Sequence, residues 1–110
     1  MKKTSRKTAR ARTTSKNTEK LFLNDVPAEF IFWLCDGRTI KNMKELGEAL
    51  NTMSDDIYAY HVNSEKNDFS KWVNDIITDT RLSSDLAGAG NRESAAKIVM
   101  ERVELLSRQL

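Results

Sequence analysis

The sequence predicts a mainly α-helical protein, with four to five short helices around one core, at most a small β-hairpin near residues 30–40, and a disordered basic N-terminal arm. Three observations lead to this prediction. Apolar residues recur at helical spacing from residue 42 onward, an Asp-Gly pair follows a short apolar run, and the first twenty residues are almost all polar. A length of 110 residues allows one domain. We therefore expect an arm over 1–20 and a helical domain over 21–110.

Composition excludes several classes of protein. Hydrophobic residues make up 39% of the chain and charged residues 31%, with four glycines and one proline, which excludes collagen-like, proline-rich and wholly disordered chains. No stretch approaches the roughly 20 apolar residues of a membrane-spanning helix, so no membrane association is expected. Cys35 and His61 are the only residues of their types. The sequence therefore predicts no metal site, no internal disulfide and no cofactor.

Charge divides the chain into two parts. The first twenty residues hold eight basic side chains and one acidic side chain, for a net charge of +7, whereas the other ninety hold ten basic and fifteen acidic residues, for −5. Because the arm has no apolar face, we expect no persistent helix or strand there. The candidate nucleic-acid-binding residues are the basic residues of the arm: Lys2, Lys3, Arg6, Lys7, Arg10, Arg12, Lys16 and Lys20.

A basic arm of this kind suits DNA or RNA, because each Lys or Arg that neutralises a phosphate releases counterions whatever the base sequence. Three other interpretations stay open. The arm folds back on the acidic body, serves as a solubilising tail, or is an organelle transit peptide. Composition favours nucleic acid among these.

The region after the arm favours a short hairpin. The apolar run of residues 30–35 stops at Asp36-Gly37, and Asp-Gly is a strong hairpin signal because both residues accept positive φ. A helical turn over 27–33, begun by Pro27, remains an alternative. We interpret Cys35 as a small buried core residue, and Trp33 and Trp72 as core anchors.

Helical spacing then continues to the C-terminus. The expected N-caps, which accept a hydrogen bond from the first turn of a helix, are Asn42 (in a capping box with Glu45), Ser54, Asn67, Asp79 and Asn91. The clearest amphipathic stripe follows Asn67, and residues 88–90 (Gly-Ala-Gly) separate the last helix, 91–109, from the rest. The inner faces predicted for these helices are Met43, Leu46, Gly47, Leu50 and Met53; Ile57, Tyr60 and His61; Phe69, Trp72, Val73, Ile76 and Ile77; Leu82 and Leu86; and Ala95, Ile98, Val99, Val103, Leu106 and Leu110.

The densest polar cluster lies over residues 61–72. His61 and Asp68 are residue types that form an acid–base pair, but no nucleophile motif or phosphate loop accompanies them. A helix–turn–helix joint explains the cluster more simply: Asn63 ends one helix, Asn67 caps the next, and His61 packs against Trp72 or bonds a backbone carbonyl.

Major-groove reading by the second helix of this joint is disfavoured. Its outer face carries Asp68 and Asp75, which would meet phosphates.

The same residues carry a family likeness. Phe32-Trp33-Leu34, Asp36-Gly37-Arg38 and the His61-Val62-Asn63…Asn67-Asp68-Phe69…Trp72 segment resemble a family of small helical domains of archaea and some bacteria that has no assigned function. The resemblance covers about residues 28–87. It implies a compact helical domain without assigned catalytic residues, so the role of His61, Asn63, Asn67, Asp68 and Trp72 stays open. At Thr78, where glycine is usual in that family, we expect the turn to differ.

These observations favour a non-enzymatic, nucleic-acid-associated protein of the cytoplasm, at the nucleoid or the ribosome. The arm would bind phosphates without sequence preference, and the helical body would dock on a protein partner or self-associate. The amphipathic last helix either packs within the chain or pairs with a second copy. The alternative is a protein–protein interaction module whose arm is solubilising or regulatory.

Overall fold

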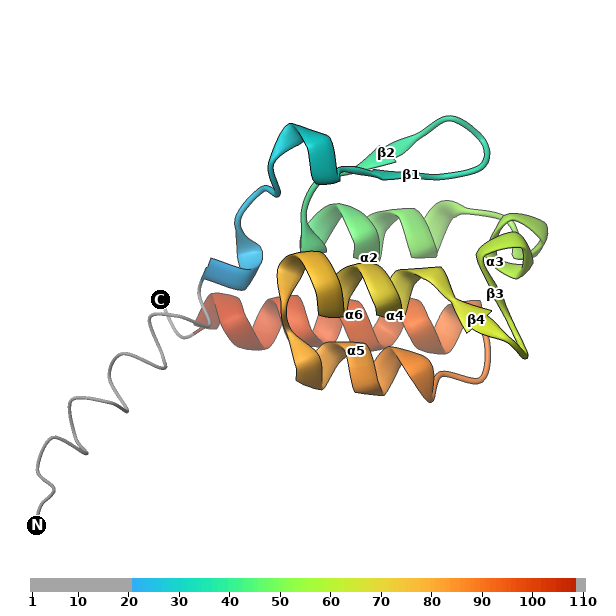
Figure 1. The fold of residues 1–110 in the computed structure, drawn as a ribbon. Coiled ribbons are helices and arrows are strands. Elements are labelled where there is room, and N and C mark those ends of the chain that lie inside the picture. The colour runs from blue at the N-terminus through green and yellow to red at the C-terminus, as the bar shows by residue number, and fades with distance from the viewer. Residues whose placement is uncertain (1–20, 109–110) are drawn as a thin grey trace, which may run out of the picture.

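The computed structural model describes residues 21–108; the basic arm and residues 109–110 lie outside the described part. Within it, five α-helices and two small antiparallel hairpins surround one core, which confirms the predicted fold class (Figure 1). The buried apolar residues run from Leu34 to Leu106, so the last helix belongs to the same core as the helices before it.

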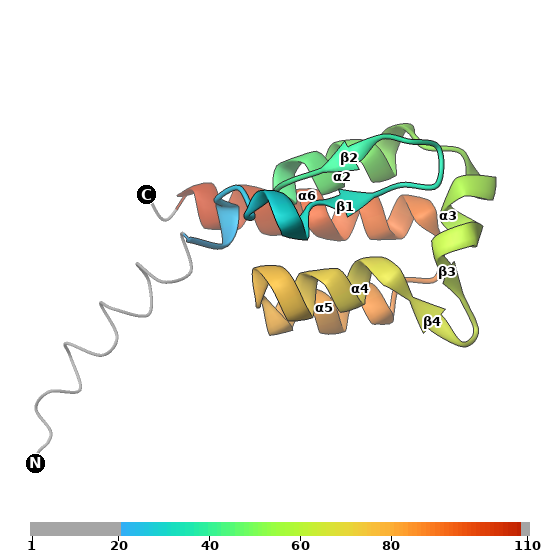
Figure 2. The ribbon, with the colours of Figure 1, turned by 45° about the horizontal axis from the view of Figure 1, so that its top comes forward.

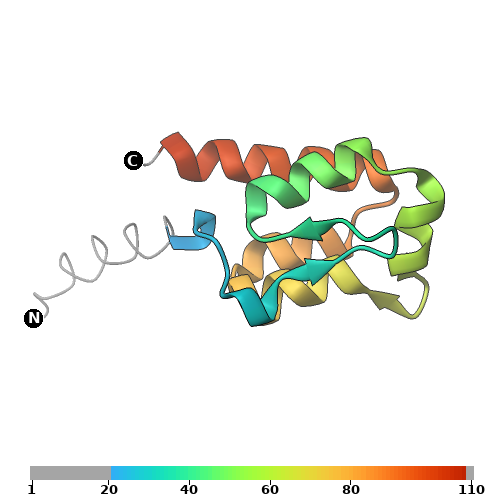
Figure 3. The same cartoon turned by 90° about the horizontal axis from the view of Figure 1, so that it is seen from above.

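The helices form two layers. Helix α2 (Met43–Thr52) packs on α6 (Arg92–Arg108), and α4 (Asp68–Trp72) packs on α5 (Thr80–Ala87) (Figure 2). Helix α3 (Asp55–His61) lies across one end and connects the layers. Seen from above, the first hairpin covers the seam between the two layers (Figure 3). Helix α6 packs on both α2 and α5, so of the two alternatives for the last helix the structure shows packing within the chain.

Side-chain caps begin all five helices, as predicted. In each case an Asn, Ser or Asp oxygen accepts the backbone N–H three residues later, over 2.8–3.2 Å. The capping box is also present, although the Glu45 carboxylate accepts the N–H of Lys41, one residue before the cap, at 2.9 Å. Because each cap satisfies an orphan donor, its loss costs about 1 kcal/mol. The caps are Asn42, Ser54, Asn67, Asp79 and Asn91.

The first hairpin pairs β1 (Phe32–Trp33) with β2 (Thr39–Ile40). Its turn is a three-residue loop in which the Gly37 N–H donates to the Leu34 carbonyl at 2.9 Å. Gly37 has a φ of 96°, and Asp36 does not have positive φ, so the loop requires only the glycine at that position. Part of the alternative helical turn over 27–33 also forms, because the 3₁₀ turn η2 (Ala28–Phe30) follows Pro27, whereas residues 32–33 belong to β1. Another 3₁₀ turn, η1 (Leu21–Leu23), lies before this range.

The joint between α3 and α4 differs from the predicted helix–turn–helix. Strands β3 (Val62–Asn63) and β4 (Lys66–Asn67) form a second hairpin there. Asn63 does not end the helix, because α3 stops at His61. Instead its side-chain oxygen accepts the N–H groups of Glu65 and Lys66 at 2.8 and 3.2 Å, which closes the hairpin turn.

Helix α4 continues directly into a π-helical turn, η3 (Val73–Ile77), that ends at Thr78. The Thr78 N–H donates to the Val73 carbonyl at 2.7 Å, and Thr78 has a φ of 70°. It is the only non-glycine residue among the described ones with positive φ. A β-branched residue thus holds the left-handed conformation that glycine adopts most readily.

Most predicted inner faces are confirmed, with two differences, and the predicted inner residue Leu110 lies outside the described residues. Tyr60 is 63% exposed, and Tyr58 instead stacks on Phe69 with ring centroids 6.0 Å apart. On α6 the buried stripe includes a charged residue, Arg102, which is paired in the core with Asp79.

Candidate functional site

A series of hydrogen bonds connects the tip of the first hairpin to the start of α4. The Cys35 N–H donates to His61 Nε2 at 3.1 Å, and His61 Nδ1 lies 3.0 Å from Asp68 Oδ2. Because Nε2 accepts, this pattern places the ring proton on Nδ1, where it donates to the carboxylate. Lys66 Nζ reaches the same Asp68 oxygen at 3.1 Å. Segments far apart in the sequence are thereby fixed to one another.

Aromatic rings enclose the imidazole of His61, a residue that is only 5% exposed. The ring of Phe32 meets the His61 ring edge to face, with 5.3 Å between the ring centroids, and stacks on the Phe69 ring with 5.1 Å between the centroids. Phe32 also contacts Trp72 at 5.9 Å. The predicted partners of His61 were wrong: it packs against Phe32 and Phe69, and it bonds a backbone N–H rather than a carbonyl.

The sequence-predicted polar motif therefore assembles as a network around this joint. His61 and Asp68 are brought together, Asn63 closes the turn, and Asn67 caps α4 while its amide donates to the Leu86 carbonyl at 3.2 Å. Trp72 is buried as predicted, and its Nε1 donates to the Phe30 carbonyl at 2.8 Å. Since both nitrogens of His61 bond protein groups, this geometry ties the β1–β2 hairpin to α4.

A groove lies beside this network, between β1 and the outer face of α4. Its volume is about 360 Å³, and its lining is mostly apolar. Lys71 and Asp75 pair at its edge at 3.0 Å, and hydrogen bonds from Lys71 and Asn74 hold the pKa of the Asp75 carboxyl below its usual range. The residues that line the groove are Phe32, Trp33, His61, Asp68, Lys71, Trp72, Asp75 and Ile76.

Trp33 projects from the edge of this groove. Its side chain is 67% exposed, the highest value among the large hydrophobic residues described. The prediction that Trp33 anchors the core was wrong, and Cys35 is likewise exposed rather than buried. Strand alternation explains both results, because Phe32 faces the core and Leu34 is buried, which turns Trp33 and Cys35 outward.

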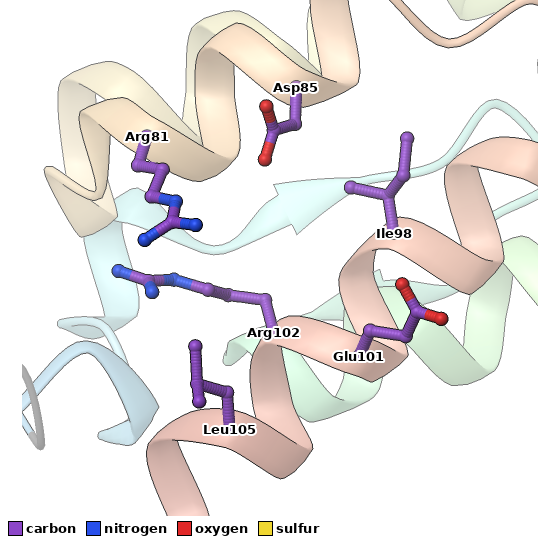
Figure 4. Close-up of a pocket in the computed structure, with 6 residues that line it drawn as sticks. All are labelled: Arg81, Asp85, Ile98, Glu101, Arg102 and Leu105. Atoms are coloured by element: carbon purple, nitrogen blue, oxygen red, sulfur yellow. The ribbon is translucent and has the colours of Figure 1, made fainter.

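A second, smaller hollow of about 220 Å³ lies between α5 and α6 (Figure 4). Arg81 and Arg102 point toward one another at one end of it, with Asp85 and Glu101 on the facing helices. Arg102 is already bonded to Asp79 through two nitrogens. The hollow thus mixes two bases with two acids and shows no excess of either charge.

Other predictions concern the basic arm, metal sites and membrane-spanning helices. The eight basic residues of the arm lie outside the described residues. In the described range no cluster of three or more His, Cys, Asp or Glu side chains is placed to hold a metal ion, and none of the described helices has the length and apolar character to cross a membrane.

Comparison of the chain with protein-family models, with curated proteins and with solved structures finds no match. The function must therefore be argued from the residues themselves.

Sequence reasoning missed two features of the site, the exposure of Trp33 and the bond from the Cys35 N–H to His61. The alternation of residues 32–35 together with the Asp-Gly turn was the signal that could have placed Trp33 on the outside. Nothing in the sequence pattern indicated that the Cys35 N–H would meet His61, because that contact spans 26 residues.

Proposed function

We propose that this chain is a non-enzymatic, nucleic-acid-associated protein of the cytoplasm, in which the basic arm binds phosphates and the helical body provides a docking surface. The separation of charge carries the proposal: the first twenty residues have a net charge of +7 and the other ninety −5. A polyanion attracts the arm and repels the body, so contact with DNA or RNA would concentrate on the arm.

The surface of the helical body is better suited to docking on a protein than to reading the major groove of DNA. The surface beside the groove carries Asp68 and Lys71 of α4 and Asp75 of η3, which gives no excess of base toward phosphate. Trp33 instead offers a large exposed apolar side chain next to an apolar hollow, an arrangement typical of protein interfaces. As part of the same proposal, we retain membership of residues 28–87 in the family of small helical domains that they resemble.

The test is fluorescence anisotropy with duplex DNA and with structured RNA at several salt concentrations. The full chain is compared with a variant whose eight arm bases are changed to glutamine. We expect the full chain to bind, with log affinity falling by several units per decade of salt at about −0.9 per neutralised phosphate, and the arm variant to lose binding.

A control compares two bases of the body with two bases of the arm, Lys2→Gln/Lys3→Gln, so that the charge removed is equal. Lys44→Gln/Lys97→Gln removes two exposed helix lysines, and it should leave affinity close to that of the natural chain. Equal binding by the arm variant would contradict the proposed role of the arm, and absence of binding by the full chain would contradict the whole proposal.

The second candidate is a protein–protein interaction module in which the arm only solubilises or regulates. The exposed Trp33 favours this alternative, because a protein partner can bind an exposed apolar side chain without any contact to nucleic acid. Under this alternative, a purified partner would bind the arm variant and the natural chain equally, and nucleic acid would bind neither.

A further inference from the structure

The hollow between α5 and α6 is lined by charged groups whose bonding capacity the described residues do not use up. Arg81 and Asp85 come from α5, and Glu101 and Arg102 come from α6 (Figure 4). None of the ion pairs among the described residues includes Arg81, Asp85 or Glu101. Arg102 is the one paired member of this set.

Arg102 nevertheless brings an unused donor to the hollow. Its side chain is 9% exposed, and its Nε and Nη2 atoms bond Asp79. A guanidinium has five N–H donors, and no described residue accepts a hydrogen bond from Nη1. Because a buried donor on a charged group is costly to leave without an acceptor, an acceptor that enters the hollow would be stabilised there.

Arg81 lies where its own helix does not favour a base. It is the second residue of α5, where the helix dipole opposes positive charge. Its side chain points toward the Arg102 guanidinium (Figure 4). Two guanidinium groups that face each other repel, and a carboxylate between them would turn this repulsion into attraction through paired N–H···O bonds.

The two acids distinguish this hollow from a site for a simple anion. Asp85 follows Arg81 by four residues, so their Cβ atoms are about 5–6 Å apart on one helix face. Glu101 comes from the facing helix. An anion such as phosphate would meet two carboxylates as well as two guanidinium groups, without an excess of positive charge to hold it. A ligand that carries both a carboxylate and an ammonium group matches both kinds of side chain.

The size and the apolar part of the lining limit the rest of the ligand. A volume of about 220 Å³ lies below the range of about 300–1,000 Å³ that is usual for sites of drug-sized ligands. Ile98 and Leu105, both half-buried, supply the apolar lining. A short branched alkyl chain can bury its methyl groups against them.

We propose that this hollow binds a small zwitterion of the amino-acid class with an aliphatic side chain. Its carboxylate lies between the guanidinium groups of Arg81 and Arg102, its ammonium group faces the two acids, and its alkyl chain contacts the apolar lining. The site shares no residue with the groove beside Trp33. Its test needs neither nucleic acid nor the basic arm, so it can fail while the proposed function holds.

The test is an NMR titration of the isotope-labelled full chain, without nucleic acid, with three probes that share a branched alkyl chain. L-Leucine carries both charged groups, isocaproate only the carboxylate, and isoamylamine only the ammonium group. We expect leucine to shift the signals of α5 and α6 around the hollow, including the Arg102 Nε–H, and the other two probes to bind at least tenfold more weakly. Equal binding by either single-charge probe would overturn the proposal, and so would the absence of shifts with leucine up to its solubility limit.

A variant at Arg81 tests the carboxylate end of the site. Arg81→Gln should raise the dissociation constant of leucine at least tenfold. Arg38→Gln removes an arginine that is also exposed but lies on the first hairpin, so it is the matched control and should leave the constant unchanged. Arg102 stays in place, because its pair with Asp79 joins the two helices. Natural leucine affinity in a folded Arg81→Gln variant would overturn the proposal.

A second variant tests the ammonium end. Asp85→Asn/Glu101→Gln removes both acids, so leucine should lose its advantage and isocaproate should bind at least as tightly as leucine. Asp56→Asn/Glu48→Gln removes two exposed acids of α3 and α2 and should leave the preference for leucine intact. An unchanged preference for leucine in the first of these variants would show that the acids do not hold the ammonium group, and this would overturn the assignment of a zwitterion.

Discussion

Arg102 and Asp79 form a two-pronged ion pair inside the core. Arg102 Nε lies 2.8 Å from Asp79 Oδ2, and Nη2 lies 3.2 Å from Oδ1. The side chains are 9% and 1% exposed. Asp79 also caps α5, because its Oδ1 accepts the Leu82 N–H at 3.1 Å. One carboxylate thus joins the start of α5 to the middle of α6.

Breaking this pair from either side should strongly destabilise the fold. Arg102→Met leaves a buried carboxylate without its counter-charge, and Asp79→Asn keeps the cap oxygen but leaves a buried guanidinium. We expect each change to lower the free energy of unfolding by about 3–5 kcal/mol. Urea denaturation followed by circular dichroism measures both changes.

The double variant decides whether the cost comes from the unpaired charge. Asp79→Asn/Arg102→Met should be less destabilised than the sum of the two single variants, because neither charge remains buried alone. Arg81→Met, at the exposed neighbouring arginine, is the control and should change stability by less than about 0.5 kcal/mol. Additive single effects would show that the two residues act separately.

Thr78 stores backbone strain that glycine would release. Its φ of 70° is costly for a β-branched residue, and its side chain is exposed, so little contact is lost on truncation. Thr78→Gly should raise the free energy of unfolding by about 1 kcal/mol. In a thermal melt this corresponds to about 4–8 °C for a domain of this size.

A matched threonine separates the φ effect from a general effect of glycine. Thr80 lies two residues later, is exposed, and begins α5 with negative φ. Thr80→Gly should therefore lower stability, because glycine disfavours helix. If both variants moved the melting temperature in the same direction, strain at Thr78 would not be the cause.

Much of the fold could be predicted because its signals are local. A cap needs only an Asn, Ser or Asp at the right offset from an apolar run, and all five predicted caps form the expected hydrogen bond. The first hairpin was equally accessible, since the Asp36-Gly37 turn follows a strand-like run.

The remaining features depend on contacts between distant residues. The π-helical turn before Thr78 and the 42-residue contact from Trp72 to the Phe30 carbonyl have no local signature. Arg102 did have one: it shares a stripe with Ala95, Val99 and Leu106, and a base on a core stripe needs a buried acid. The sequence does not reveal which acidic residue pairs with Arg102, because the predicted capping role of Asp79 already explains the presence of that residue.

His61 should prove to be a structural residue whose loss loosens the hairpin. His61→Phe keeps a ring of similar size but leaves the Cys35 N–H and the Asp68 carboxylate without that partner. We expect a loss of about 2 kcal/mol in stability. Hydrogen exchange of the Cys35 amide, followed by NMR, should become faster in the variant.

The neighbouring Tyr60 provides the control for this change. It is 63% exposed and contacts the His61 ring at 5.0 Å. Tyr60→Phe should leave both the stability and the Cys35 exchange rate close to natural values. Unchanged Cys35 exchange in a folded His61→Phe variant would contradict the anchoring role of His61.

Gly47 permits the close approach of α2 to α6, and its effect on stability should depend on Met100. A Cβ at Gly47 would overlap Met100 Sδ and lie 3.3 Å from Val99 Cγ1. In the natural chain Gly47→Ala must displace the flexible, partly exposed Met100 side chain, so it should stabilise less than the helix propensity of alanine alone would give. In a Met100→Ala background the overlap is gone, and alanine should stabilise α2 by up to about 1 kcal/mol through its helix propensity. Denaturation of the four proteins in this double-mutant cycle measures the coupling. Equal effects of Gly47→Ala in both backgrounds would show that Met100 does not set the spacing of these helices.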